Sequence, residues 1–168
     1  KCPDIENIKV TESYGIQICA MPKVDQKYLD HAKKVMDKLI DYNGDGLVDN
    51  QMAIDKVIST GSPYVVFSKE REEDKFQDEF YSDEALDYMD ECEELKDEEI
   101  CVALAEEKYG TWLAVFTKEM NLSGSGWDPT IEEGLHLLTH MGYAQAYPDI
   151  FGQHKDSEIA KFMDNARG

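Results

Sequence analysis

The spacing of apolar residues along the chain predicts alternating strands and helices. From Tyr14 to Ala20 apolar and polar residues alternate as in a strand with one buried face, and Pro22 ends the segment. Asp25 is a good helix N-cap, and after it apolar residues recur every three or four positions as far as Ile40. This part of the chain therefore predicts a strand followed by an amphipathic helix.

The same reasoning predicts further strands and helices downstream. Residues 62–68 and 111–117 have the composition of buried strands, whereas residues 52–58 and 102–109 have helical spacing. A last short helix is predicted over about residues 156–166. Strands separated by helices are typical of a layered α/β or α+β fold, and 168 residues suffice for a single domain with its own core.

Residues 69–100 differ in composition from the rest of the domain. They carry an acidic residue in nearly every turn, with aromatic and apolar residues scattered between them. A charge run of this kind is usually the solvated face of a helix. We therefore expect an acidic helical excursion from the domain.

The segment from Thr130 to Tyr143 predicts a helix with one polar window. At about 100° per residue, a sector roughly 120° wide holds Glu132, Glu133, His136, Thr139, His140 and Tyr143. The remaining arc holds Ile131, Gly134, Leu135, Leu137, Leu138 and Met141. We therefore expect a helix buried on most of its surface, and Asp128 followed by Pro129 predicts its start.

The polar window has the composition of a metal site. Carboxylates, imidazoles and a phenol are donors that first-row transition metals prefer. Burying the carboxylates without a counter-ion would be costly, and a bound cation avoids that cost. We expect zinc or another first-row metal on Glu132 and His136, with His140 one turn further on. The alternative is a metal-free polar seam in which the histidines are hydrogen-bonded to Glu132 and Glu133.

Residues 41–52 match the calcium loop of an EF-hand. Gly46 supplies the sharp turn at position 6, but Met52 stands at position 12, where the loop normally has a bidentate glutamate. We expect a calcium ion that acts as a structural clip of reduced affinity. The alternative is a solvated turn, because Asn-Gly and Asp-Gly are turn signals by themselves. The expected ligands are Asp41, Asn43, Asp45, Leu47 (through its backbone carbonyl) and Asp49.

The charge balance excludes some classes of partner. The chain has 36 acidic and 17 basic residues and a net charge of -19. Nucleic acids and anionic membranes bind positive surfaces, so we expect neither, and divalent cations are the natural partners. No apolar run approaches the roughly 20 residues that span a bilayer, which argues against membrane insertion.

The four cysteines favour an oxidising, extracellular setting. We expect disulfides Cys2–Cys19 and Cys92–Cys101 because each pair is close in sequence. Four cysteines allow three pairings, and reduced core thiols are the alternative to all of them. An Asn-Leu-Ser glycosylation sequon at Asn121 also favours a secreted protein.

The order of strand, amphipathic helix, strand, excursion, strand and polar-windowed helix resembles the zincin metallopeptidase domain. The active helix of zincins carries His-Glu-x-x-His, and Glu132-Glu133-Gly134-Leu135-His136 occupies its place here. Glu132 thus replaces the first histidine. The resemblance implies a mixed sheet with a buried metal-binding helix, Glu133 as general base, and Tyr143 or Tyr147 near the oxyanion. The third ligand would be His140, or otherwise Tyr147, Asp149 or His154.

These observations predict a secreted calcium-binding protein with a zincin-like metal site on the 130–143 helix. If that site is catalytic, the substrate is a peptide and Glu133 is the general base. One alternative is a non-enzymatic extracellular metal-binding protein on a degenerate zincin-like scaffold. The other is an acidic matrix or adhesive module.

Overall fold

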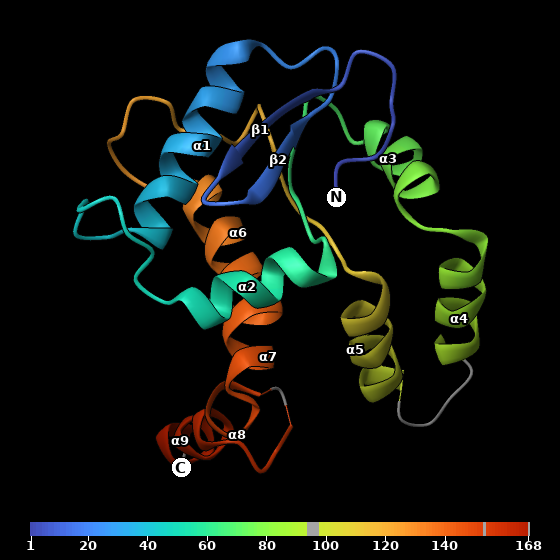
Figure 1. Cartoon of the computed structure of the whole chain (residues 1–168), viewed down its shortest axis with the longest axis vertical. Coiled ribbons are helices and arrows are strands. Elements are labelled where there is room, and N and C mark those ends of the chain that lie inside the picture. The colour runs from blue at the N-terminus through green and yellow to red at the C-terminus, as the bar shows by residue number, and fades with distance from the viewer. Residues whose placement is uncertain (94–97, 153, 168) are drawn as a thin grey trace.

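Four strands form one mixed sheet in the residues that the computed structural model describes, which are 1–93, 98–152 and 154–167. The β1–β2 pair is antiparallel, whereas β2–β3 and β3–β4 are parallel. The expectation of a single α/β domain with a mixed sheet is confirmed. Across the sheet the order is β1 (Lys9–Ser13), β2 (Ile16–Ala20), β3 (Tyr64–Phe67) and β4 (Leu113–Phe116) (Figure 1).

The first strand predicted from the sequence is shorter than expected and has a partner that the pattern did not show. Tyr14 and Gly15 form the turn between β1 and β2, with φ angles of 48° and 91°. A positive φ is easy for glycine but unfavourable for tyrosine. The Tyr14 hydroxyl donates a hydrogen bond to Asp41 Oδ2 at 2.8 Å, which holds the turn in place.

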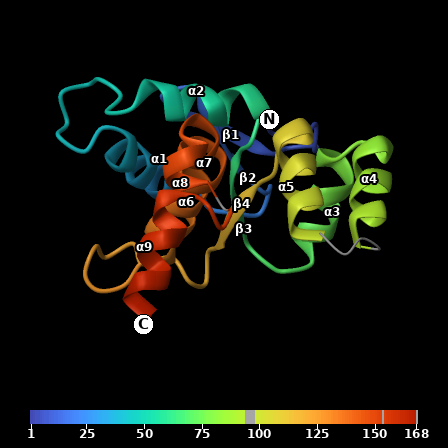
Figure 2. The same ribbon diagram turned by 90° about the horizontal axis from the view of Figure 1, so that it is seen from below.

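Helices cover both faces of the sheet. α1 (Gln26–Ile40) packs on β1 and β2, and α6 (Pro129–Leu137) packs on α1 and β4. Figure 2 shows α1 and α6 on one side of the sheet and α3, α4 and α5 on the other. The core therefore lies on both sides of β3, whose four residues are all buried.

The acidic stretch is helical where the structure describes it. It contains α3 (Glu72–Phe80) and α4 (Asp83–Glu93), and α5 (Glu98–Tyr109) continues beyond it; residues 94–97 lie outside the described residues. Phe76 of α3 is buried, and its ring contacts Phe67 and Trp112 edge-on at centroid distances of 5.7 and 5.6 Å. This aromatic cluster attaches the acidic helices to the sheet.

The helix predicted over residues 130–143 is present, but it changes type part-way. α6 ends at Leu137 and continues directly as η1 (Leu138–Tyr143), a π-helical segment. Gly134, Leu137, Leu138 and Met141 are buried as predicted. Ile131 and Leu135 are 43% and 45% exposed. The prediction that most of the helix surface is buried was therefore wrong for the side of α6 that carries these two residues. α1 and β4 cover one side of α6 and leave that flank to solvent.

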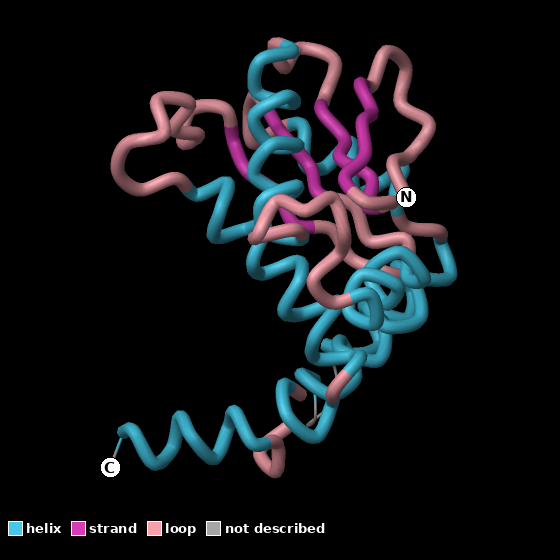
Figure 3. Tube along the Cα trace, turned by 60° about the vertical axis from the view of Figure 1, so that its left-hand side comes forward, coloured by secondary structure: helices cyan, strands magenta, loops and turns pink. Residues whose placement is uncertain are grey.

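The C-terminal elements follow η1 at one end of the domain. They are α7 (Ala144–Ala146), α8 (Pro148–Phe151) and α9 (Glu158–Arg167). α9 contacts α8 and extends away from the rest of the chain (Figure 3). No helix among the described residues has the length and apolar character needed to cross a membrane.

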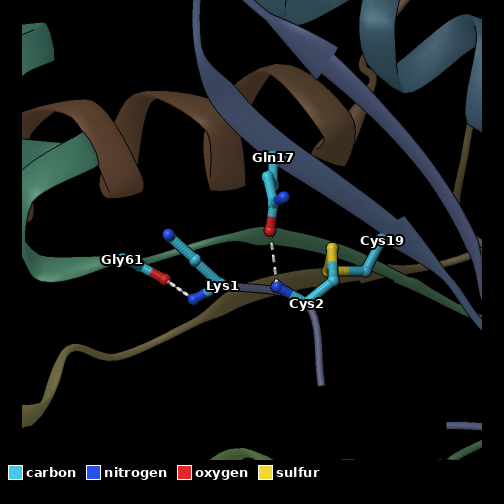
Figure 4. Close-up of a disulfide and its surroundings, with 5 residues drawn as sticks. All are labelled: Lys1, Cys2, Gln17, Cys19 and Gly61. Carbon is cyan, nitrogen blue, oxygen red and sulfur yellow. Dashed lines mark hydrogen bonds between the residues drawn. A yellow bond between two sulfur atoms is a disulfide. The ribbon is translucent and has the colours of Figure 1, made fainter. Parts of the chain in front are cut away.

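Both predicted disulfides are confirmed. Cys2–Cys19 joins the N-terminal segment to β2, and Cys92–Cys101 joins α4 to α5. Figure 4 shows that the N-terminal segment is also held by hydrogen bonds. Cys2 N donates to Gln17 Oε1 at 2.8 Å, and the terminal amine of Lys1 donates to the Gly61 carbonyl. Together these contacts fasten the N-terminus to β2 and to the end of α2 (Gln51–Thr60).

We predict that Gly142→Ala destabilises the protein and that Gly134→Ala does not. A Cβ at position 142 would lie 3.0 Å from the backbone oxygen of Ala53 on α2, which cannot move aside independently. Overpacking of this kind costs about 1–3 kcal/mol. At position 134 the close atoms are the flexible ends of Leu39 and Met36, and alanine gains helix propensity, so we expect a change within about 1 kcal/mol.

Urea unfolding of both variants measures this difference. The midpoint should fall for Gly142→Ala with an unchanged m-value, which identifies a change in stability rather than in the denatured state. Equal midpoints for the two variants would show that η1 at Gly142 does not pack closely on the backbone of α2 at Ala53.

Candidate functional site

A cleft of about 540 Å³ opens between α5, the start of β4 and η1. Its size lies within the range of small-molecule and cofactor sites in proteins. Polar and aromatic side chains from elements far apart in the sequence meet in it. The lining residues are Glu106, Thr111, Trp112, Leu113, His136, Thr139, His140, Ala144 and Phe151.

The two histidines of the 130–143 segment both reach this cleft. His136 lies at the end of α6, and His140 lies in η1. A π-helix closes its hydrogen bonds five residues apart instead of four, so it rotates the following side chains away from their α-helical positions. π-helical turns occur frequently at functional sites. The side chains after Leu138 therefore do not lie on the face that a uniform α-helix would give them.

His140 is paired with a carboxylate that the sequence did not single out. Its Nε2 lies 2.5 Å from Oε2 of Glu106 on α5, and the two side chains are 27% and 20% exposed. A hydrogen bond to a sheltered carboxylate is stronger than one between neutral groups. The pair therefore ties α5 to η1 across the cleft.

His136 faces a carboxylate from its own helix. Its Nδ1 lies 3.4 Å from Oε2 of Glu133, at the long end of hydrogen-bond distances. Glu133 does not line the cleft.

Burial, followed by the nearby charges of Glu133 and Asp128, raises the pKa of the Tyr64 hydroxyl. That hydroxyl donates to the Thr130 carbonyl at 3.2 Å, so the first turn of α6 is held against β3.

The other predicted residues of this region lie apart from the cleft. Glu132 does not line it, and neither does Tyr143, whose ring packs on Tyr147 and Phe151. Tyr147 donates to Asn50 Oδ1, and His154 Nε2 lies 3.0 Å from the Pro148 carbonyl oxygen.

Of the zinc ligands expected from the sequence, His136 and His140 line the cleft and Glu132 does not. Among the side chains that the structure describes, no three histidine, cysteine, aspartate or glutamate residues are arranged to hold a metal ion. Glu132 does not line the cleft, and the carboxylate in contact with His140 is that of Glu106. The donor set thus does not fit the zinc site that the resemblance implied.

The calcium-type loop joins α1 to α2 and is organised by Asp41. The two carboxylate oxygens of Asp41 accept backbone hydrogen bonds from Gly44, Asp45 and Gly46 at 2.7 to 3.1 Å. Tyr14 adds a side-chain donor. Burial opposes ionisation of Asp41, but the bonds from Tyr14 and from the backbone outweigh it and lower the pKa of the carboxyl.

The remaining ligand candidates of the loop are also engaged in short-range hydrogen bonds. Asn43 Oδ1 accepts from Asp45 N, Asp45 Oδ1 accepts from Leu47 N, and Asp49 Oδ2 accepts from Tyr42 N. The loop ends at Asn50, which caps α2 by accepting from Ala53 N at 3.1 Å and also receives the Tyr147 hydroxyl. The loop is therefore an ordered turn that connects to the segment after η1.

Asp128 fixes the start of the histidine-bearing helix. It caps α6 as predicted by accepting from Thr130 N, and its Oδ2 lies 2.7 Å from Nε2 of His31 on α1. Burial alone would raise the pKa of Asp128, but the hydrogen bonds from His31, Thr130 and Asn121 outweigh it and lower that pKa. His31 thus joins α1 to α6.

β4 is the last strand in the sheet order, and its first residue, Leu113, lines the cleft. Leu113 N donates to Pro63 O, and Thr117 N donates to Phe67 O. The main-chain N–H and C=O groups of the odd-numbered residues of β4 therefore point toward β3. The N–H and C=O of Ala114 consequently point the other way. In the described part of the chain, the sheet has no further strand beyond β4.

Sequence reasoning missed the residues that complete the cleft from outside the histidine helix. Glu106 is one of 36 acidic residues, and helical spacing alone gives no reason to select it. Thr111 and Trp112 lie within the predicted strand 111–117, and Phe151 follows a predicted turn. Only their position opposite η1 brings them into the site.

Comparison with known proteins finds no matching family model, no matching curated protein and no matching solved structure.

We predict that Asp128→Asn destabilises the protein at neutral pH and less so in acid. The folded pKa of Asp128 is lowered, so its carboxylate adds stability above the unfolded pKa of about 3.9 and loses it as the pH falls through the folded value. Removing the charge should cost about 1–3 kcal/mol at pH 7. Urea unfolding at pH 7, 5 and 3 should show the gap to wild type narrowing.

The exposed Asp149 supplies a matched control. Asp149→Asn should stay within about 0.5 kcal/mol of wild type at each pH. A gap between Asp128→Asn and wild type that is constant from pH 7 to pH 3 would contradict the assigned role of the ionised carboxylate.

Proposed function

We propose that this is an extracellular protein that binds extended peptide segments in the cleft beside β4. One observation carries the proposal: the open edge of β4, with the main-chain groups of Ala114 pointing outward, borders a cleft lined by polar and aromatic side chains. An exposed sheet edge binds an extended chain through main-chain hydrogen bonds, and pockets beside it select side chains.

The lining of the cleft supports a peptide as ligand. Trp112 and Phe151 offer aromatic surface, whereas Glu106, His136 and His140 offer hydrogen-bonding groups on the helical side. Sites that combine apolar walls with a few placed polar groups are typical of specific ligand binding. A peptide uses both kinds of surface, because its backbone pairs with β4 while a side chain enters the cleft.

The arrangement of α1, the sheet and the α6–η1 helix supports a zincin-like scaffold as part of this proposal. α6 lies next to the edge strand β4 and carries Glu133 and His136 in the order of the zincin motif. Of the expected ligands, His136 and His140 line the cleft and Glu132 does not. Peptide hydrolysis with Glu133 as general base stays a prediction.

Calcium binding at residues 41–49 is a second candidate function, favoured by the ordering of its loop. Asp41, Asn43, Asp45 and Asp49 occupy ligand positions between two helices, and Gly46 has the positive φ of 85° that the sharp turn needs. Calcium there would connect α1 to α2 and stabilise the fold outside the cell, where the two disulfides also persist.

We predict that Ala114→Pro abolishes peptide binding without unfolding the protein. The Ala114 N–H points to the open edge, so proline removes no hydrogen bond of the sheet, and proline is tolerated on edge strands. An array of ten-residue peptides identifies ligands, and fluorescence anisotropy then measures the dissociation constant of the strongest. We expect a loss of about tenfold or more for Ala114→Pro, since the Ala114 donor is lost and the proline ring occupies space at the edge where the bound strand would pair.

Ala114→Val is the matched control because it keeps the N–H and suits a strand. It should bind within about twofold of wild type. The proposal fails if no array peptide binds wild type above background, or if Ala114→Pro binds as tightly as Ala114→Val.

We predict that the chain binds calcium and that Asp45→Asn weakens this binding. Because calcium binds the folded loop, adding it at millimolar concentration after chelation should raise the melting temperature by several degrees. Asp45→Asn should reduce the shift, whereas the exposed control Asp78→Asn, with the same charge change, should not. Metal analysis of the same samples also measures zinc.

An unchanged melting temperature at millimolar calcium would mean that residues 41–49 form only a turn. Zinc at near-stoichiometric level that His136→Ala removes would instead favour the metallopeptidase prediction.

A further inference from the structure

One carboxylate, that of Glu106, lines the cleft beside the imidazoles of His136 and His140. Glu106 lies in its wall, and among the described residues that line it there is no lysine or arginine. The chain as a whole carries a net charge of -19. The cleft is therefore a place where a negative field meets low-dielectric aromatic walls, which strengthens the attraction for a cation.

The carboxylate of Glu106 has capacity for a further partner. A carboxylate offers about four lone-pair sites, and the contact with His140 Nε2 occupies one side of Oε2. An ionised Glu106 carries its negative charge on both oxygens, Oε1 and Oε2. The side chain is only 20% exposed, so water solvates this charge less than it would at the surface.

Two lysines near Glu106 in the sequence, Lys108 and Lys118, are paired with other carboxylates. Lys108, two residues further on α5, has its ammonium 3.1 Å from Glu84 Oε1 and 4.4 Å from the centroid of the Tyr109 ring. Lys118, which follows β4, has its ammonium 2.7 Å from Glu70 Oε1. Glu133 adds a second carboxylate close to His136.

The walls of the cleft suit the stem of a long basic side chain. Trp112 and Phe151 provide aromatic faces, and Leu113 and Ala144 add aliphatic surface. Lysine and arginine bury their methylene stems against such surface, and a guanidinium stacks well on an indole. A guanidinium also matches the planar geometry of a carboxylate.

We infer that the cleft binds the side chain of a basic residue, arginine in preference to lysine, with Glu106 as the recognising carboxylate. This inference rests on the proposed function, because it names the class of peptide that lies along β4. The basic side chain leaves the bound strand, passes Trp112 and ends at Glu106. A partner of positive charge is also the one that the acidic surface attracts over distance.

The test compares two extended ten-residue peptides that differ at one central position, arginine or citrulline. Citrulline has nearly the same shape as arginine but no charge. Both are measured by fluorescence anisotropy against wild type, Glu106→Gln and Glu107→Gln. Glu107 is the exposed neighbour of Glu106 on α5, so the two variants change the net charge equally.

Wild type should bind the arginine peptide about tenfold or more tightly than the citrulline peptide, since charge pairs sheltered from water contribute at this level. Glu106→Gln should remove this preference, whereas Glu107→Gln should keep it. A lysine peptide should fall between the other two. Circular dichroism melts of both variants show that they are folded before the affinities are compared.

Two results would overturn the inference while leaving the proposed function standing, provided that Ala114→Pro still abolishes binding. One is equal affinity of wild type for the arginine and citrulline peptides. The other is an equal effect of Glu106→Gln and Glu107→Gln, which would show attraction by overall charge rather than recognition by Glu106. Failure of wild type to bind either peptide, or any on the array, would overturn the proposed function as well.

Discussion

The α6–η1 helix depends on close approach to its neighbours at two glycines. Gly134 faces Leu39 and Met36 of α1, and Gly142 faces Ala53 and Val57 of α2, with hypothetical Cβ contacts between 2.8 and 3.4 Å. A side chain at position 142 would meet the backbone of α2 and hold the helices apart, whereas one at position 134 would meet only the flexible ends of Leu39 and Met36. The packing therefore sets the height and rotation of the helix, and with them the places of His136 and His140. The cleft and its neighbour β4 follow from this placement.

Histidine–carboxylate pairs connect this helix to the rest of the domain. His31 and Asp128 join α1 to the start of α6, and His140 and Glu106 join η1 to α5. In a chain with about half as many basic as acidic residues, imidazoles serve as partners for sheltered carboxylates. The pairs thus hold α6 against α1 and η1 against α5.

Local signals predicted most of the secondary structure and both disulfides, because each depends on residues close in sequence. Asp128 and Pro129 marked the start of α6, apolar spacing marked α1, and the cysteines paired with their nearest neighbours. The pattern missed β1, since Tyr14 at the turn takes a left-handed conformation that its contact with Asp41 supports. It also missed the π-helical turn, which periodicity at 100° per residue cannot represent.

The sequence by itself determined an acidic α/β domain, the helix that carries His136 and His140, and the ordered loop around Asp41. It also indicated that carboxylates and imidazoles would meet on that helix. Only the tertiary structure decided which ones meet, placing Glu106 of α5 against His140 and leaving Glu132 outside the cleft. The reason is physical: helical spacing fixes neighbours within one element, whereas contacts between elements depend on packing at Gly134 and Gly142, which no local pattern encodes.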